Sequence, residues 1–187
     1  SARHDILCPY YREKYPETFD AGVDEKLVYC GPYKLEDKLE GSSMTIAQAL
    51  LSPTRTYAPV IMKIMKKHPG LIKGLVHCSG GGQTKCVRFG KSVHFVKDNL
   101  MDVPPIFKAI QKASGTSDRE MFEVYNMGHR MEVYCSKSDA KKVIDIAESY
   151  AVEARVIGHT EKSARPDRKN HVSVKYAGKT LEYGPRD

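Results

Sequence analysis

The chain lacks the features that mark a membrane-spanning or secreted protein. No apolar run approaches the roughly 18 residues that a membrane-spanning helix needs. Residues 1–5 are polar and charged, so no secretory signal peptide is predicted. We therefore expect a cytoplasmic location and no membrane partner. An initiator Met is also missing, which suggests that further sequence precedes Ser1.

Cysteine and histidine patterns typical of disulfides or metal sites are absent as well. The five cysteines are an odd number without a C-x-x-C pair, so no disulfide framework is expected and a reducing compartment fits. The seven histidines form no H-x-H or H-x-x-x-H pair, so we predict no metal ligands. Cys78 adjoins His77, but neighbouring strand residues point to opposite faces, which argues against a cysteine nucleophile.

Charge of one sign is in excess. The 30 Lys and Arg residues outnumber the 23 Asp and Glu residues, for a formal charge of +7. Such a charge favours an anionic partner, either nucleic acid or a phosphorylated metabolite, although a merely soluble basic surface would look the same. Neither an Arg-rich helix nor an aromatic RNA-binding strand motif is present, so we expect no nucleic acid and favour a phosphorylated small molecule.

Secondary-structure signals are clear after residue 44. Capping signals and helical spacing predict helices at residues 45–52, 57–68, 104–115, 117–125 and 138–151. Apolar and alternating runs predict strands at residues 72–78, 93–96, 131–135 and 152–157, with a terminal hairpin at 172–176 and 180–183. The predicted fold class is α+β, with a mixed sheet and helices packed on it.

The predicted organisation is one domain covering residues 1–187. It comprises an irregular N-terminal extension (1–44), a core (45–160), and a loop with the terminal hairpin (161–187). The charged residues 160–170 are expected to form a mobile loop. In the predicted strand at 131–135, Met131 and Val133 should face the core, with Glu132 and Tyr134 opposite.

The strongest candidate for chemistry is a glycine-rich loop. Gly80, Gly81 and Gly82 directly follow the predicted strand at 72–78. Adjacent glycines allow a sharp bend whose amide groups can cradle an anion, and Lys85 could add charge. The loop matches neither a Walker A nor a Rossmann pattern, and a tight strand exit without a ligand is the alternative.

Arg55 and His77 are the other candidate side chains. Arg55 falls at the start of a predicted helix, where a positive charge is unfavourable, so a phosphate or carboxylate partner is indicated. A structural pairing with an acidic residue of the same domain is the alternative. His77 precedes the glycine loop and is either a phosphate or proton donor or a histidine hydrogen-bonded inside the sheet.

Three segments together resemble a known enzyme family. Residues 50–57 (LLSPTRTY), 74–82 (GLVHCSGGG) and 120–128 (EMFEVYNMG) resemble, in order and separation, the second domain of phosphoribosylformylglycinamidine cyclo-ligase, in its longer bacterial branch. The resemblance covers about residues 45–160. It implies an α+β domain with partial likeness to a ferredoxin-like arrangement.

The resemblance also implies a reaction. Such enzymes use ATP to activate formylglycinamidine ribonucleotide and close the imidazole ring of aminoimidazole ribonucleotide in purine biosynthesis. It implies that ATP and Mg²⁺ are held mostly by an N-terminal domain outside this chain, and that the complete enzyme is a homodimer. The chain alone is then expected to be inactive. The alternative is a freestanding phosphate- or nucleotide-binding module of the same superfamily.

Carried over by position, the resemblance implies a set of substrate- or phosphate-binding residues and no catalytic or metal-binding residue in this chain. The implied set is Thr54, Arg55, His77, Gly80, Gly81, Gly82, Asn126 and Gly128. The chain departs from the family pattern at His129 and Arg130, where many members have small residues. Bulk and charge at those two positions are expected either to alter the cleft or to mark a branch that binds its anion differently.

Overall fold

A computed structural model describes residues 2–184 and divides into two compact units. The first unit combines the residues up to 54 with residues 103–121, and the second combines residues 55–102 with the residues from 122 onward. That the whole chain is one domain of a larger enzyme stays a prediction.

The first unit is built from short helices. Its α-helices are α1 (Ala2–Ile6), α2 (Tyr10–Lys14), α3 (Ile46–Leu51), α5 (Pro105–Ser114) and the first part of α6 (Asp118–Val124), and its 3-10 turns are η1 (Pro16–Thr18) and η2 (Glu25–Leu27). The predicted capping box begins α3, and the predicted Gly115 cap, with φ 68°, ends α5.

The predicted irregular extension packs a small core of its own. Ile6, Val28 and Tyr29 are buried in it. The backbone of residues 4–8 runs against that of residues 30–33, and Gly31 permits this contact because a Cβ there would lie 2.2 Å from the Ile6 carbonyl carbon.

The second unit contains both sheets. Its elements are α4 (Ala58–Lys67), β1 (Gly74–His77), the 3-10 helix η3 (Gly82–Arg88), β2 (Val93–Lys97), β3 (Met131–Tyr134), the 3-10 turn η4 (Lys137–Asp139), α7 (Ala140–Glu148), β4 (Gly158–Lys162), β5 (His171–Tyr176) and β6 (Lys179–Tyr183). This mixture of helices with sheets confirms the predicted α+β class. The partial ferredoxin-like likeness stays a prediction.

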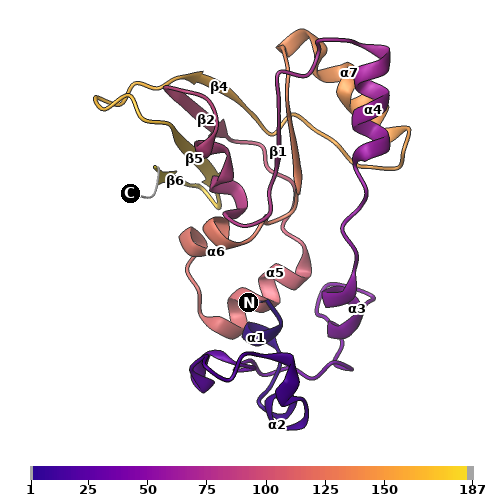
Figure 1. Cartoon of the computed structure of the whole chain (residues 1–187), viewed down its shortest axis with the longest axis vertical. Helices are drawn as coiled ribbons and strands as arrows, with labels where there is room; N and C mark the ends of the chain where they lie inside the picture. The colour runs from indigo at the N-terminus through magenta and orange to yellow at the C-terminus, as the bar shows by residue number, and fades with distance from the viewer. Residues whose placement is uncertain (1, 185–187) are drawn as a thin grey trace. The chain divides into compact units, whose positions relative to one another are not determined.

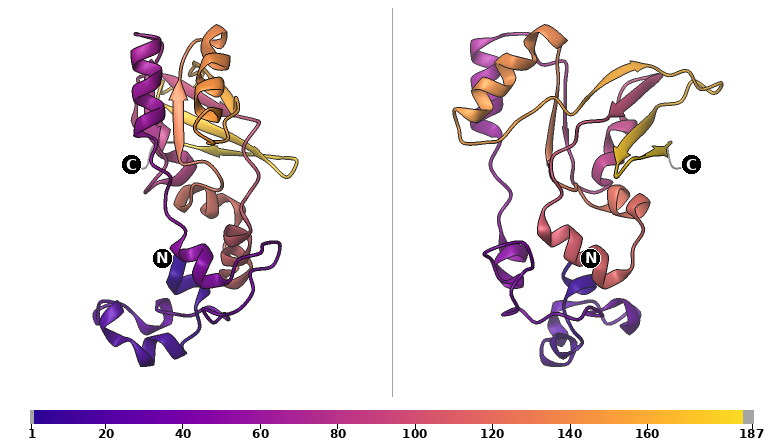
Figure 2. Two further views of the ribbon diagram at one scale, coloured as in Figure 1. Left: turned by 90° about the vertical axis from the view of Figure 1, so that its right-hand side faces the viewer. Right: turned by 180° about the vertical axis from the view of Figure 1, so that it is seen from behind.

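Strands β1 and β3 form a two-stranded antiparallel sheet with helices on one face. Helices α4 and α7 lie side by side (Figures 1 and 2). Their buried Val60, Ile64 and Ile146 form a core against which Cys135, just after β3, packs. The helical spacing read from the sequence therefore locates the apolar faces of both helices.

The other sheet has four strands in the order β4-β2-β5-β6 (Figure 1). Strands β2 and β5 pair in parallel, and the remaining neighbours are antiparallel, so the sheet is mixed as predicted. One face points inward and carries Phe95, Val172 and Val174, all buried. Phe95 meets Tyr134 of β3 edge to face at 5.7 Å, which links this sheet to the two-stranded one.

The predicted strand at 152–157 is wrong. The predicted loop over 160–170 is wrong in its first residues, which belong to a strand. The strand is β4, at Gly158–Lys162, with four exposed residues. It lies at the sheet edge and pairs only with β2. An edge strand with polar side chains leaves no hydrophobic signal, whereas the apolar residues Val152 and Ala154 pack on the helical core from an irregular segment.

The predicted facing of β3 is reversed. Glu132 is 4% exposed and points into the interior, whereas Met131 and Val133 are only half-buried. The reason is that the face with Glu132 and Tyr134 is turned to the larger sheet, whereas on the opposite face Leu75 of β1 is 40% exposed. Alternation along the strand is present, but polar residues occupy its buried face.

Within residues 2–184, none of the helices combines the length and the apolar character needed to cross a bilayer.

Candidate functional site

The loop after β1 bends sharply because its glycines adopt left-handed conformations. Gly81 and Gly82 have φ values of 97° and 47°, which other residues rarely adopt. The amide of Gly82 donates to the carbonyl of Ser79 at 2.9 Å and closes the turn. Helix η3 then begins at once. We name residues 79–82 the glycine loop.

Gly82 also allows a close backbone contact. A Cβ at this position would lie 2.4 Å from the Tyr125 carbonyl oxygen and 2.7 Å from that of Phe122. The glycine loop therefore packs directly against the chain that leaves α6. Of the three glycines, Gly82 has a structural reason to be glycine, independent of any ligand.

Gly80 and Gly81 form the outward part of the loop. Gly80 is exposed, with no atom near the place of a Cβ, and among residues 2–184 neither amide has an acceptor in the hydrogen-bond network. The Lys85 ammonium reaches back and donates to the Ser79 hydroxyl at 2.6 Å. Two amides and an ammonium thus surround the bend, an arrangement suited to an anion.

The turn at residues 126–128 lies beside the glycine loop, as the resemblance implies. The side chain of Gln83 donates to the Asn126 carbonyl oxygen. The Asn126 side chain accepts from the Gly128 amide at 3.1 Å and shapes its own turn. Gly128 has φ 140°, and a Cβ there would lie 3.0 Å from the Asp102 carbonyl oxygen. Both residues therefore have roles in holding the turn.

The end of β1 and the start of β3 are neighbours in the sheet. His77 pairs with Met131 in the antiparallel register, and the Cys78 amide donates to the Arg130 carbonyl oxygen at 2.7 Å. The glycine loop, which follows β1, and the segment at 129–130, which precedes β3, thus lie at the same end of this sheet.

His77 is exposed, so it is not a histidine enclosed by the sheet. Its ring meets that of Tyr57 edge to face at 6.4 Å. Burial raises the pKa of Tyr57, although the charges of Arg130 and Arg55 act to lower it, which places both guanidinium groups near this phenol. Positive charge therefore gathers around Tyr57, next to the strand that leads into the glycine loop.

Arg55 lies before the helix and not at its start. Helix α4 begins at Ala58, with Tyr57 as the N-cap, and Arg55 is exposed in the preceding segment. The predicted conflict with the helix dipole is therefore wrong. The predicted phosphate role of Arg55 stays a prediction.

Thr54 belongs to the first compact unit, whereas the other predicted site residues belong to the second. Its predicted place beside them stays a prediction.

The expected effect of His129 on a cleft is wrong. His129 is 8% exposed and turns inward, where its Nε2 lies 3.0 Å from Glu132 Oε1. Since a carboxylate only accepts, Nε2 carries the proton and Nδ1 is left to accept from the Gln83 side chain at 3.5 Å. His129 is therefore part of the interior.

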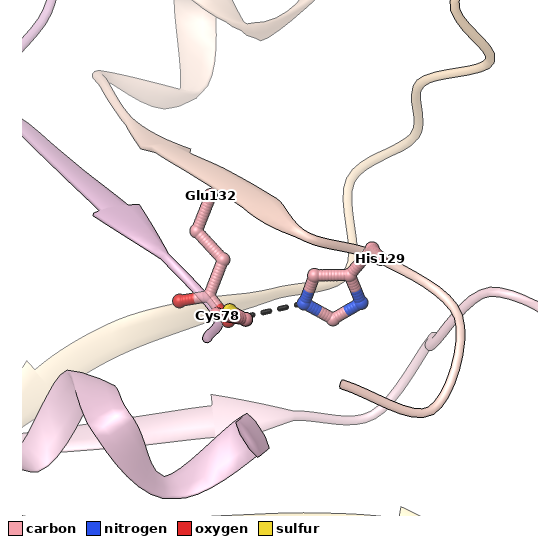
Figure 3. A group of neighbouring side chains, drawn as sticks. All are labelled: Cys78, His129 and Glu132. Carbon is pink, nitrogen blue, oxygen red and sulfur yellow. Dashed lines mark hydrogen bonds and ion pairs between the residues drawn. The ribbon is translucent and has the colours of Figure 1, made fainter. Parts of the chain in front are cut away.

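A buried ion pair that no sequence pattern indicates lies next to the glycine loop. The Lys97 ammonium, on a side chain that is 4% exposed, lies 2.5 Å from Glu132 Oε1 and donates to the Gln83 carbonyl oxygen at 2.6 Å. Cys78 Sγ donates to the same carboxylate oxygen at 3.1 Å, and the Tyr134 hydroxyl donates to Oε2 at 2.5 Å. Figure 3 shows three of these side chains, Cys78, His129 and Glu132, converging.

This network braces the start of η3. Lys97 comes from β2, Glu132 from β3 and Gln83 from the residue after the glycine loop. The loop is therefore attached to both sheets through buried, charge-assisted bonds. A charged residue in each of two strands was visible in the sequence, but the pairing depends on the sheet arrangement.

Electrostatics keep the network ionised at Glu132 and Lys97. Burial opposes a charged Glu132, but the Lys97 ammonium and the bonds from His129 and Tyr134 hold the pKa of Glu132 well below its usual range. Burial likewise opposes a charged Lys97, but the carboxylate outweighs it and raises the pKa of Lys97. The cluster is therefore close to neutral overall.

The two buried thiols remain protonated. Burial raises the pKa of Cys86 to about 11, and burial together with the Glu132 carboxylate raises the pKa of Cys78 further. A thiol that does not ionise is a poor nucleophile, so the structure gives no support to cysteine catalysis here.

Two groups of side chains in residues 2–184 bring metal-ligating atoms together: Cys78, His129 and Glu132 in one, and His94, His171 and Glu182 in the other. Neither group is the set of oxygen ligands that Mg²⁺ prefers, so these residues do not fit the Mg²⁺ that the resemblance implies.

A sequence profile described as "AIR synthase related protein, C-terminal domain" matches residues 32–169, most of the chain. The chain belongs to this family. The family relationship expected from the three segments is thereby confirmed, and the match begins before the expected core.

Relatives of the AIR synthase family support the same relationship. "Phosphoribosylformylglycinamidine cyclo-ligase" of Methanococcus vannielii is 41% identical over 140 residues, 73% of this chain and 40% of that protein. The protein of the same name from Caldicellulosiruptor saccharolyticus is 33% identical over 144 residues, 75% of this chain and 40% of that protein. The chain spans about two fifths of the length of these relatives. The branch within the family stays a prediction.

Proposed function

We propose that this chain supplies the phosphate-binding side of a cyclo-ligase active site. The proposed reaction is the ATP-dependent closure of formylglycinamidine ribonucleotide to aminoimidazole ribonucleotide. The names of the relatives and the family match support the reaction. The observation that carries the role of this chain is the pair of Gly80 and Gly81 amides that have no acceptor in residues 2–184.

The surroundings of the glycine loop favour an anion. Lys85 donates to the loop, and His77 leads into it. Arg55 and Arg130 lie near Tyr57, which contacts His77. A phosphate oxygen in the bend would accept from main-chain amides while these cations balance its charge. We propose that Asn126 and Gly128 complete the wall around the substrate on this unit.

We propose that the remaining machinery lies in a further domain. ATP and Mg²⁺ would be held mostly there, as the resemblance implies. The partners of this chain would then be that domain and a second copy of the protein in a cytoplasmic homodimer. In the bound complex, the chain would orient the substrate phosphate and hold the loop rigid through Lys97 and Glu132.

The phosphate role is tested by titrating the chain with inorganic phosphate and following amide resonances by nitrogen-15 NMR. The amides of Gly80 and Gly81 should shift with saturation, whereas the Gly82 amide, bonded to Ser79, should move less. A chloride titration at equal ionic strength is the control. Phosphate shifts confined to other residues would overturn the assignment.

The reaction is tested separately with formylglycinamidine ribonucleotide and ATP. The chain alone should release no ADP, and addition of the N-terminal part of the Methanococcus vannielii relative should restore turnover. Turnover by the chain alone would contradict a divided site. A phosphate-binding chain that never supports turnover would indicate a freestanding binding module.

A further inference from the structure

The outward face of the four-stranded sheet carries a second cluster of potential ligands. His94 on β2, His171 on β5 and Glu182 on β6 place one ligand atom each within 4.8 Å of the others. The three strands are neighbours in the sheet (Figure 1), and His94 and His171 are direct register partners. The sequence hides this group because its members are far apart along the chain.

Hydrogen bonds fix the tautomer of both histidines. His94 Nδ1 lies 2.7 Å from Glu161 Oε1, and since a carboxylate only accepts, this nitrogen carries the proton. The Ser163 hydroxyl donates to the Lys169 carbonyl oxygen at 2.9 Å, so it accepts from His171 Nδ1 at 3.1 Å. In the neutral form of each ring, the lone pair then lies on Nε2.

The two rings present these lone pairs side by side. They stack with centroids 4.0 Å apart and planes inclined by 14°. His94 Nε2 contacts the Ser173 hydroxyl, which can rotate away. In a tetrahedral zinc site, two nitrogen ligands lie roughly 3.3 Å apart, and the two stacked rings would have to turn toward each other before both lone pairs point at one ion. Two side-by-side imidazoles next to a carboxylate are a set of borderline ligands that zinc prefers.

The contact behind His94 favours a cation at this place. A carboxylate that holds the far nitrogen of a ligating histidine is the usual support of a zinc site, and Glu161 holds His94 in this way. The cluster of Cys78, His129 and Glu132 differs, because the Lys97 ammonium already balances its carboxylate.

We propose that His94, His171 and Glu182 form a binding site for a divalent transition metal of the zinc type. Water would complete the coordination, since His94 is partly exposed and Glu182 is exposed. The site does not rest on the proposed function, and it stands against the expectation from sequence spacing that the histidines hold no metal, which stays a prediction.

The test uses the whole chain, freed of metal by a chelator and titrated with zinc chloride in a calorimeter. About one Zn²⁺ should bind per chain, and His94→Asn and Glu182→Gln should abolish that binding. Glu161→Gln should weaken it roughly 10- to 100-fold, as loss of an outer-shell partner does. His159→Asn, an exposed histidine on β4, is the matched control and should bind zinc as the parent does.

Cobalt distinguishes the two clusters. Co²⁺ at the proposed site should show ligand-field bands without the near-ultraviolet charge-transfer band of a thiolate ligand, and Cys78→Ser should leave them unchanged. Thermal melts of the metal-free variants check folding, and Zn²⁺ should raise the melting temperature of the parent and of His159→Asn but not of His94→Asn or Glu182→Gln. Absence of Zn²⁺ binding, equal binding by Glu182→Gln, or a thiolate band lost in Cys78→Ser would each overturn the proposal.

Discussion

At the residue scale, a single substitution in the buried Lys97–Glu132 pair should lower the stability of the protein strongly. Lys97→Met leaves a carboxylate 3% exposed without its counter-ion, so the free energy of unfolding should fall by about 3–5 kcal/mol. Urea titration followed by circular dichroism measures the change. The control, Lys141→Met, removes an exposed pair with Asp145 and should cost less than about 1 kcal/mol.

Replacement of both partners sharpens that prediction. Lys97→Met combined with Glu132→Leu removes both buried charges at once, so it should be more stable than either single variant. A double variant as unstable as the sum of the singles would show that the two side chains do not act as a pair.

The free energy of unfolding at acid pH depends on the ionisation of Glu132. Its pKa is lowered by folding, so its contribution is complete above the unfolded value of about 4.3 and is lost as pH falls through the folded value. The free energy of unfolding should therefore decline below about pH 4.3 more steeply in the parent than in Glu132→Gln. Urea titrations between neutral and acid pH measure both slopes. Equal slopes would mean that Glu132 titrates alike in the folded and unfolded chain.

Adjacent glycines of the loop should respond differently to the same substitution. Gly82→Ala places a Cβ 2.4 Å from the Tyr125 carbonyl oxygen in a left-handed conformation, so we expect a loss of about 1–3 kcal/mol of stability. Gly80→Ala meets open space and should fold as the parent does. Melting temperatures of the two variants provide the comparison, and a Gly80→Ala variant as unstable as Gly82→Ala would contradict the described bend.

At the element scale, the β5–β6 hairpin follows from its turn. Ala177 and Gly178 both have positive φ, 48° and 75°, as a two-residue type I′ turn requires. Ala177→Asn should raise the free energy of unfolding by about 0.5–1 kcal/mol, because asparagine tolerates this conformation better than alanine. Gly178→Ala should lower it. Urea titration of both variants checks the signs, and two changes of the same sign would be inconsistent with this turn.

Local patterns predicted the elements whose signals lie within a few residues. The capping box of α3, the Gly115 cap of α5 and the terminal hairpin are of this kind. The edge strand β4 was missed because its stability comes from hydrogen bonds to β2 and not from its own apolar residues.

At the scale of the whole molecule, the formal charge of +7 favours an anionic ligand. Which cations bind that ligand depends on where they lie. Arg55→Ala should weaken phosphate binding by about 1.5–3 kcal/mol, as loss of one charge-assisted bond does, and should leave the melting temperature nearly unchanged. Calorimetric titration with phosphate measures the first quantity. The control is Arg155→Ala, which removes an arginine bonded to Glu153 and should not change phosphate affinity. A lowered melting temperature with unchanged affinity would instead assign Arg55 a structural role.

By itself, the sequence determined the α+β class, most helices and strands, the glycine bend and the family, because each depends on residues close together in the chain or on segments in a fixed order. Only the tertiary structure decided which charges are buried and which histidines meet. Lys97 and Glu132 are 35 residues apart, and His94 and His171 are 77 apart, as their numbers show. Such pairs depend on strand order and register, which are set by the packing of both sheets together.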